Sequence, residues 1–327
     1  MSVTPERAAE LCKAVKSELS KVIVGQEKTV NELIISLFAK GHCLLIGVPG
    51  LAKTLLVKSL AEVIHVDFNR IQFTPDLMPA DILGAELVSD KGGQLTFEYQ
   101  QGPIFTNLLL ADEINRTPPK TQAALLEAMQ EKKVTSGGET RTLPNPFLVV
   151  ATQNPIEQEG TYPLPEAQLD RFMFSLNVEY PTIEEERLIV KQTTINKKVE
   201  LQSVITLEEI LDIQSLIRDL PVSDHVINYA VDLVSATRPG SSREVEATKN
   251  YIDWGAGPRA SQYLILGAKA MALLEGRLAP ETKDIRAVAA AVLQHRIVIN
   301  YKATGQGLDA IKVTEKLIEQ VREETYA

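Results

Sequence analysis

One stretch of the sequence reads Gly47-Val48-Pro49-Gly50-Leu51-Ala52-Lys53-Thr54. It follows the short apolar run 43–46, which predicts a strand, and precedes a helical pattern over 55–63. A strand, a Gly-rich turn and a helix in this order predict a phosphate-binding loop, because the turn points its N–H groups inward and the helix N-terminus faces the anion. We expect Lys53 to reach the β- and γ-phosphates of a nucleotide and Thr54 to hold Mg²⁺.

One residue departs from the usual loop pattern, since Ala52 stands where glycine normally precedes the lysine. Glycine is required where φ is positive or where a Cβ would collide with the ligand. We expect Ala52 to enter the helix with a negative φ, so that its methyl group is tolerated.

Two carboxylates follow a later apolar run. The run 108–111 predicts a strand, and Asp112 and Glu113 come directly after it. Because ligands of open α/β sheets bind at the carboxyl ends of the strands, we expect both side chains near the phosphate-binding loop. Asp112 is then expected to bind Mg²⁺ through water, and Glu113 to orient and polarise an attacking water.

The last two chemical candidates are an amide and an arginine. The predicted strand 147–150 ends just before Asn154, whose neutral side chain can hydrogen-bond both a γ-phosphate oxygen and a water. Leu169-Asp170-Arg171-Phe172 then places a charged pair before the apolar run 172–174. Taken alone, Asp170 and Arg171 could form an ordinary surface salt bridge.

The order of the predicted elements gives the fold class. Helical patterns at 4–20 and 30–37 come first, and short apolar strands then alternate with helices up to residue 180, which predicts an α/β fold with a parallel sheet. Segments 83–99, with a turn at 90–93, and 134–143 predict two inserted β-hairpins. After Pro181 we expect no more strands, only helices, at 184–194, 207–218, 222–237, 259–276 and 281–299. Two domains are predicted, an α/β nucleotide-binding domain at 1–180 and a helical domain at 181–327.

Composition limits the possible functions. The chain has 327 residues, with 34 Lys and Arg against 43 Asp and Glu, a net charge of -9 that is the wrong sign for a protein that mainly binds nucleic acid. It shows no signal-peptide pattern and no apolar run of roughly 18 residues, so we expect a cytoplasmic protein without a membrane span. Cys12 and Cys43 are expected to be reduced core thiols.

Taken together, these motifs resemble those of an AAA+ ATPase. The resemblance rests on Gly47 to Thr54, Asp112-Glu113-Ile114-Asn115-Arg116, Asn154-Pro155 and Leu169 to Phe172. Further stretches are similar to the MoxR family in particular: Arg70-Ile71-Gln72-Phe73-Thr74-Pro75-Asp76-Leu77-Met78-Pro79-Ala80-Asp81-Ile82, Gln101-Gly102-Pro103, 118–122, 125–129 and 162–168. The similarity covers residues 20 to 300, and it includes the form of the loop with alanine before the lysine.

The resemblance implies the remaining structure and site. It implies a parallel five-stranded P-loop NTPase sheet, a C-terminal all-α lid domain, and a first hairpin of the kind shared with magnesium chelatase and MCM-type motors. It makes Asn154 the sensor 1 residue, Arg171 an arginine finger that acts on a neighbouring subunit's nucleotide, and Arg259 the sensor 2 residue. ATP is expected to contact the loop residues from Gly47 to Leu55. Its adenine is expected to lie near Val24 and Gly25. Arg116 is a further charged candidate at a subunit edge.

The resemblance implies ATP hydrolysis by a hexameric ring that remodels a partner protein. Relatives suggest chaperone-like maturation or metal-cofactor insertion, with a von Willebrand factor A-domain protein as a partner. Two alternatives stay open: a nucleic-acid-stimulated motor like the MCM proteins, and a nucleotide-gated scaffold with little turnover. A σ54-type activator is disfavoured, because no Gly-Ala-Phe-Thr-Gly-Ala loop occurs in the first hairpin segment.

Overall fold

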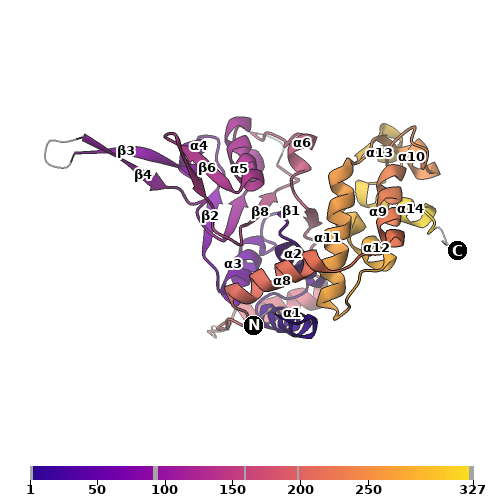
Figure 1. The fold of residues 1–327 in the computed structure, drawn as a ribbon, viewed down its shortest axis with the longest axis horizontal. Coiled ribbons are helices and arrows are strands. Elements are labelled where there is room, and N and C mark those ends of the chain that lie inside the picture. The colour runs from indigo at the N-terminus through magenta and orange to yellow at the C-terminus, as the bar shows by residue number, and fades with distance from the viewer. Residues whose placement is uncertain (1–2, 91–94, 158–159, 197–198, 324–327) are drawn as a thin grey trace.

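The computed structural model describes residues 3–90, 95–157, 160–196 and 199–323. An α/β core stands at the centre, a helical lid packs on one side of it, and a long hairpin projects on the other (Figure 1). Most of the turn predicted at 90–93 lies outside the described residues. Among those that are described, no helix combines the length and the apolar character needed to cross a membrane.

The core is built on one parallel sheet of five strands. Its order is β2-β5-β8-β1-β9, with every neighbouring pair parallel, which confirms the predicted sheet. Residues of β5 are all buried, as expected for a strand covered on both faces. The strands are β1 (Cys43–Ile46), β2 (Phe68–Gln72), β5 (Leu108–Asp112), β8 (Leu148–Gln153) and β9 (Phe174–Asn177).

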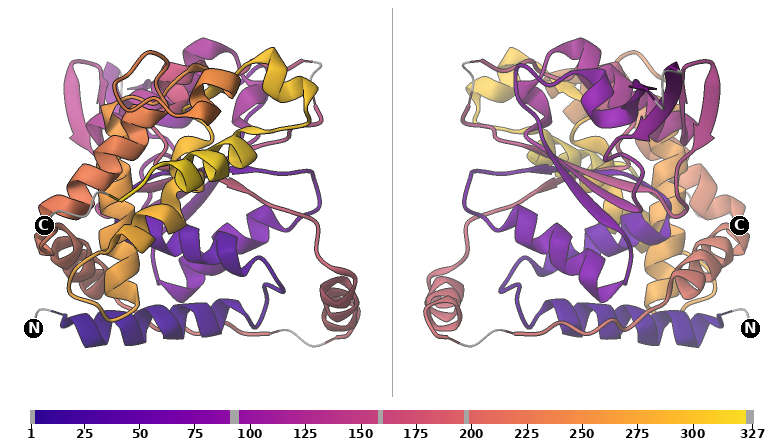
Figure 2. Two further views of the ribbon diagram at one scale, coloured as in Figure 1. Left: turned by 90° about the vertical axis from the view of Figure 1, so that its right-hand side faces the viewer. Right: turned by 90° about the vertical axis from the view of Figure 1, so that its left-hand side faces the viewer.

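Helices cover both faces of this sheet (Figure 2). Leu45 and Leu110 face a core cluster shared with α1, α2 and α3, whereas Leu44 and Leu109 face a second cluster with α5. This division follows from the strand geometry, since successive side chains point to opposite faces. The helices are α1 (Pro5–Leu19), α2 (Glu27–Phe38), α3 (Lys53–Val63) and α5 (Pro119–Glu131).

Both predicted hairpins are present. The first pairs β3 (Gly84–Asp90) with β4 (Leu95–Gln101), and the second pairs β6 (Lys133–Ser136) with β7 (Glu139–Thr142). Gly84 has a φ of 103° and lies so close to the partner strand that an added Cβ would come within 2.3 Å of the Gln100 carbonyl oxygen. Three short helices complete this part of the chain: α4 (Pro79–Leu83), η1 (Ile114–Arg116) and α6 (Glu166–Leu169).

The C-terminal part is helical, as predicted, with one small exception. The helix expected over 281–299 ends at Leu293, and Val298–Ile299 pairs instead with Ile252–Trp254 in a two-stranded ribbon. The expectation that strands stop after Pro181 is therefore wrong here, because a run of β-branched residues after the helix favours extended backbone. The elements are α7 (Ile183–Thr193), α8 (Leu207–Asp219), α9 (Asp224–Ala236), α10 (Glu246–Tyr251), β10 (Ile252–Trp254), α11 (Pro258–Leu274), α12 (Thr282–Leu293), β11 (Val298–Ile299), α13 (Tyr301–Gly305) and α14 (Ala310–Gln320).

The lid and the α/β core share one hydrophobic cluster. Helix α11 packs against α1 and α2, and Gly267 of α11 lets the helix approach Met173 and Phe174 of the core. Cys12 and Cys43 are buried and unpaired, as predicted. The interface between the two parts is therefore a continuation of the core.

One buried carboxyl makes the stability depend on pH. Glu32 of α2 is 8% exposed, and burial raises its pKa from 4.5 to about 7, only partly opposed by the Lys28 charge. In the unfolded chain the group ionises near its ordinary pKa, so the folded state loses stability as pH rises from about 4.5 to 7 and then stays level.

We predict that Glu32→Gln raises the free energy of unfolding at pH 8 by on the order of 3 kcal/mol and changes it little at pH 4.5. Urea unfolding at both pH values measures this difference. Glu62→Gln, at a largely exposed site on α3, serves as the control and should show no such pH dependence. An equal effect of Glu32→Gln at both pH values would contradict the burial argument.

Candidate nucleotide-binding site

The predicted loop lies at the carboxyl end of β1, at the mouth of a cavity of about 430 Å³. The cavity is lined by Pro49 to Leu55 together with Asp112, Glu113, Thr152, Gln153 and Asn154. These residues follow β1, β5 and β8, which are adjacent in the sheet. The topology thus brings together most of the chemical candidates that the sequence identified.

The loop conformation corrects one prediction. Ala52 has a φ of 55°, in the left-handed region, and helix α3 begins only at Lys53. Our expectation of a negative φ at Ala52 is therefore wrong: Ala52 is the last residue of the turn and does not itself enter the helix. Gly50 also has a positive φ of 84°, and no atom lies within 4 Å of the place its Cβ would occupy. Space for an anion is open beside the loop at Gly50.

Lys53 extends back over its own loop. Its ammonium donates to the carbonyl oxygens of Gly47, at 2.5 Å, and Val48, at 2.8 Å. Burial lowers the pKa of Lys53, while the nearby charges of Asp112 and Glu113 oppose that shift. An ammonium has three donors, so one remains for a phosphate oxygen.

Asp112 is held by two neighbours at the end of β5. The Thr152 hydroxyl donates to Oδ1 at 2.6 Å, and the Arg70 guanidinium donates to Oδ2 at 2.7 Å. Carboxylate and hydroxyl oxygens are the hard ligands that Mg²⁺ prefers. Thr54 and Asp112 line the same cavity and therefore fit the predicted metal-binding pair.

Glu113 has strained backbone and a fixed side chain. Its φ is 59°, and its N–H donates to the Thr152 hydroxyl at 2.8 Å. Its Oε2 accepts from Gln72 at 2.7 Å and pairs with Arg116 at 3.1 Å. Arg116 therefore contacts a predicted catalytic group in its own chain, which the subunit-edge hypothesis did not foresee.

Asn154 belongs to the same polar network. It is 7% exposed, and its Oδ1 accepts from the Ile156 N–H at 3.2 Å. The Arg116 guanidinium, with a smaller effect of Asn154, lowers the pKa of Glu157. Sequence reasoning missed Arg70, Gln72, Thr152 and Glu157. The i and i+2 spacing of Arg70 and Gln72 on one strand was the available signal, since it places both side chains on one face.

Val24 and Gly25 do not line this cavity. They border a separate pocket with Leu188 of α7, and an added Cβ on Gly25 would come within 2.5 Å of a Glu185 carboxylate oxygen. Their neighbour Gln26 donates to the Glu179 carbonyl oxygen at 2.7 Å. This contact places the segment beside the chain that continues from β9.

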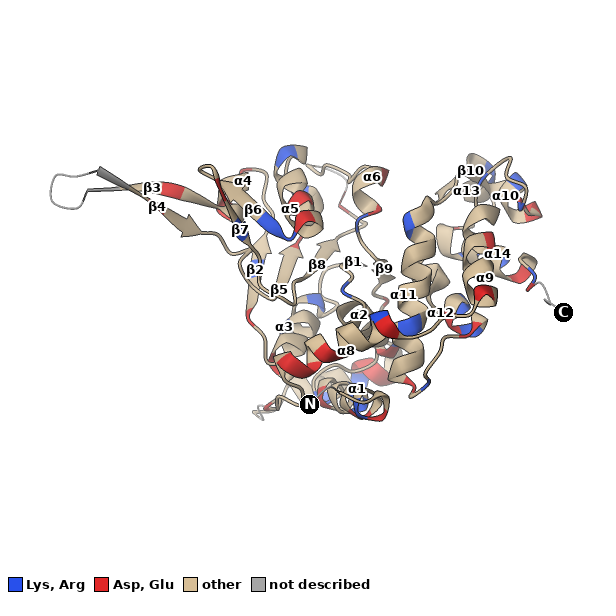
Figure 3. Ribbon diagram, viewed as in Figure 1, with Lys and Arg blue, Asp and Glu red and all other residues tan. Residues whose placement is uncertain are grey.

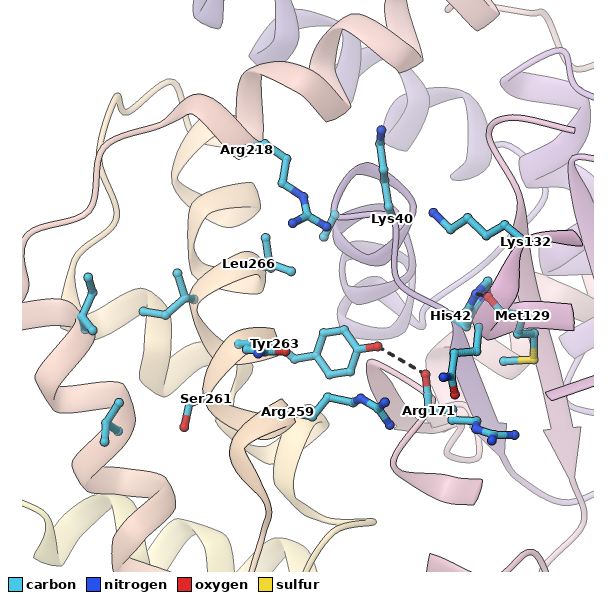
Figure 4. Close-up of a pocket in the computed structure, with 16 residues that line it drawn as sticks. Lys40, His42, Met129, Lys132, Arg171, Arg218, Arg259, Ser261, Tyr263 and Leu266 are labelled. Atoms are coloured by element: carbon cyan, nitrogen blue, oxygen red, sulfur yellow. Dashed lines mark hydrogen bonds between the residues drawn. The ribbon is translucent and has the colours of Figure 1, made fainter. Parts of the chain in front are cut away.

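Arg171 and Arg259 also lie away from the loop, in a second cavity between core and lid (Figure 4). Arg171 lies shortly before β9, at the amino end of that strand. The loop follows the carboxyl end of β1, which is the parallel neighbour of β9, so the two lie at opposite edges of the sheet. Arg259 forms an ion pair with Asp170 at 2.9 Å. The structure therefore groups the two predicted arginines with each other and not with Lys53.

A buried arginine that the sequence did not single out fixes this second region. Arg296 of the lid donates to Asp170 Oδ1 at 2.8 Å and to the carbonyl oxygens of Asp170, Phe172 and Met173. Tyr263 donates to the remaining carbonyl oxygen of the segment, that of Arg171, at 3.4 Å. Side chains of the lid thus donate hydrogen bonds to all four backbone carbonyl oxygens from residue 170 to residue 173. A lone arginine in a helical segment gives no sequence signal for such a role.

Comparison with known proteins identifies the family. A family model described as ATPase family associated with various cellular activities (AAA) matches residues 42–174, and an AAA lid domain model matches 245–320. The chain is 43% identical to Chaperone MoxR1 of Mycobacterium tuberculosis over 304 residues, covering 93% of this chain and 80% of that protein. The chain belongs to the MoxR family of AAA+ ATPases.

Two further similarities agree with this placement. The MoxR-family chain is 42% identical to YeaC of Bacillus subtilis, an uncharacterized protein, over 95% of this chain and 94% of that one. It also matches the crystal structure of a Cytophaga hutchinsonii protein assigned as an ATPase, with a TM-score of 0.90, 43% identity and coverage of 98% and 97%. The AAA+ fold with its C-terminal lid is thereby confirmed. The exact domain boundary near residue 181 stays a prediction.

The left-handed backbone at Ala52 leads to a test of the loop. We predict that Ala52→Gly keeps or slightly raises stability, and that Ala52→Val lowers it by about 1 to 2 kcal/mol, because β-branched residues are poorly tolerated at positive φ. Thermal unfolding compares both with Ala124→Val, a half-buried position with ordinary helical backbone in α5. A stable Ala52→Val protein would contradict the positive φ.

Arg296 leads to a second prediction for this MoxR-family chain. Arg296→Lys keeps the charge but loses the planar fork, so we expect the free energy of unfolding to fall by about 2 to 4 kcal/mol. Amide hydrogen exchange at residues 170–173 should accelerate as well. Arg286→Lys, a surface pair on α12 with Glu323, is the control and should cost less than about 1 kcal/mol. Equal effects of the two substitutions would refute the role of Arg296.

Proposed function

We propose that this protein hydrolyses ATP to ADP and phosphate and uses the reaction, within a ring of identical subunits, to remodel a partner protein. One observation carries the proposal: Lys53, Thr54, Asp112, Glu113 and Asn154 converge on one cavity at the loop. Each has the chemistry that one part of phosphoryl transfer requires.

The roles follow from charge and position. Lys53 holds the β- and γ-phosphates, and the loop N–H groups with the α3 N-terminus bind the remaining phosphate charge. Glu113 orients and polarises the attacking water, and Asn154 donates to the γ-phosphate and fixes that water. Thr54 and Asp112 hold Mg²⁺, which when bound neutralises charge that develops on the phosphate oxygens.

Arg171 is proposed to act on the nucleotide of a neighbouring subunit. The loop and Arg171 occupy opposite ends of the strands, and Arg171 forms no side-chain ion pair within the described chain. Its charge is therefore available to a second molecule. Arg259 shares its cavity and is proposed to act from the same side. We keep Val24 and Gly25 as the proposed adenine contacts, supported by the hydrogen bond of the neighbouring Gln26 to the segment that continues from β9.

The proposed partner is a protein. The projecting β3–β4 hairpin exposes Leu87, Val88 and Phe97, which are 50%, 58% and 71% exposed. Apolar side chains on a projecting hairpin suit contact with another polypeptide. One relative is named a chaperone, which supports chaperone-like maturation. Metal-cofactor insertion, a hexameric ring and a von Willebrand factor A-domain partner are proposed from the family resemblance alone.

Two observations disfavour a nucleic-acid motor. Lys133 and Arg141 of the second hairpin are paired with Glu131 and Glu139, and Lys132 lines the cavity between core and lid instead. Phosphate backbone binding needs unpaired cations along a surface. A scaffold with little turnover is less favoured because Glu113 and Asn154 line the same cavity as Lys53.

We predict that ATPase activity per subunit rises with protein concentration and that Glu113→Gln and Arg171→Ala both abolish it. A finger of this kind supplies roughly 10³- to 10⁵-fold in rate. Arg171→Ala should still bind ATP, because Arg171 is far from the loop of its own chain. Activity is measured across a dilution series, with particle mass determined in the same samples.

Mixing the two inactive variants gives the sharper result. In mixed assemblies, the Glu113→Gln chain supplies Arg171 to a site with an intact Glu113, so turnover should return. Arg187→Ala, an exposed arginine of α7, is the control and should behave like the wild type. Concentration-independent hydrolysis, or no recovery on mixing, would refute the neighbouring-subunit role. ATP-dependent assembly without any turnover would favour the scaffold.

A further inference from the structure

The cavity between core and lid has an unusual lining. Five cationic side chains border it, and no carboxylate of the described chain is among the lining residues. Its volume is about 730 Å³, within the range of small-ligand sites. Figure 4 shows Lys132 on the core side pointing toward Arg218 on the lid side, with Lys40 between them extending to one side, and Tyr263 between this group and the two arginines already assigned, Arg171 and Arg259.

Lys40, Lys132 and Arg218 are not neutralised by the protein. None of the three forms an ion pair within the described parts of the chain, whereas most arginines there do, as with Arg70, Arg277 and Arg286. Arg218 stands at the end of α8, after the acidic start of that helix (Figure 3). Burial and the charges of Lys40 and Arg218 lower the pKa of Lys132. These three positive charges therefore lie near one another in a chain whose net charge is -9.

The backbone beneath the two lysines is strained as well. Lys40 and Lys132 follow α2 and α5 with φ values of 58° and 54°, in the left-handed region that glycine prefers. Sparsely populated conformations of this kind gather at functional sites. His42, on the wall beside them, stays neutral: burial lowers its pKa to about 4, and its Nδ1 accepts from the Val149 N–H. His42 therefore adds no charge to this part of the cavity, and the positive charge there belongs to Lys40, Lys132 and Arg218.

We propose that this cavity binds a phosphate-bearing anion, with Lys40, Lys132 and Arg218 as its charged ligands. Three cationic side chains from core and lid that line one cavity suit an oxyanion with several charged oxygens, because charge-assisted hydrogen bonds to phosphate are strong. Asp170 is paired with Arg259, and the charge of Asp219 acts on Lys269. The anion comes from one of two sources: a free phosphate compound, or a nucleotide held by a second copy of this chain.

The test uses inorganic triphosphate and the full chain carrying Lys53→Ala, which weakens the loop of the first cavity. Isothermal titration should show saturable binding that Lys132→Gln and Arg218→Gln each weaken about 10- to 100-fold, the loss expected for one charged hydrogen bond. Lys13→Gln, an exposed lysine of α1, is the matched control and should bind as tightly as its parent. Circular dichroism melts verify that all variants fold.

Absence of saturable binding, or equal affinity of the cavity variants and the control, overturns the proposal. A second measurement separates the two sources. If ATP-dependent association of the Glu113→Gln chain is lost with Lys132→Gln and Arg218→Gln, the second copy supplies the phosphate. If association persists while triphosphate binding weakens, a free compound is the ligand. Neither readout requires hydrolysis, so failure of the proposed ATPase activity is distinguishable from failure of this site.

Discussion

The direction of the parallel sheet is the constraint on which the rest of the structure depends. All five strands point the same way, so the turns that follow β1, β5 and β8 meet at one edge and gather Lys53, Asp112 and Asn154 there. The segment that leads into β9 and carries Arg171 belongs to the opposite edge. Strands of four to six residues separate the edges by roughly 13 to 20 Å. The chain therefore cannot bring its free arginine to its own loop without unfolding the sheet.

The lid makes this second edge rigid. Arg296 is buried at the junction, and burial lowers its pKa against the opposing charge of Asp170. A buried guanidinium is costly unless every donor is satisfied, and here the carboxylate of Asp170 and the backbone carbonyls of Asp170, Phe172 and Met173 satisfy it. The same carboxylate also holds Arg259. Any rotation of the lid relative to the core would consequently move the Arg171 segment with it.

Backbone strain is concentrated at the two cavities. Six residues other than glycine have positive φ within the described chain, and four of them line these cavities: Ala52 and Glu113 at the loop, Lys40 and Lys132 between core and lid. Each follows a strand, a tight turn or a helix end, where the chain changes direction abruptly. Packing of the sheet and its helices supplies the free energy that maintains these conformations.

The sequence by itself determined the local chemistry of this protein. The loop, the carboxylates after β5 and the apolar periods of strands and helices are consequences of neighbouring residues, and they sufficed for the fold class, the two hairpins and the main residues at the loop. Only the tertiary structure decided which distant side chains meet. Arg70 reaches Asp112, Arg116 reaches Glu157, and Arg296 holds the chain before β9, each across separations of about forty residues or more. It also decided that φ at Ala52 is positive, since that angle depends on how β1 and α3 are held apart by the sheet. Such contacts depend on how helices and strands are placed relative to one another in space. The pattern of neighbouring residues in the sequence does not specify that placement.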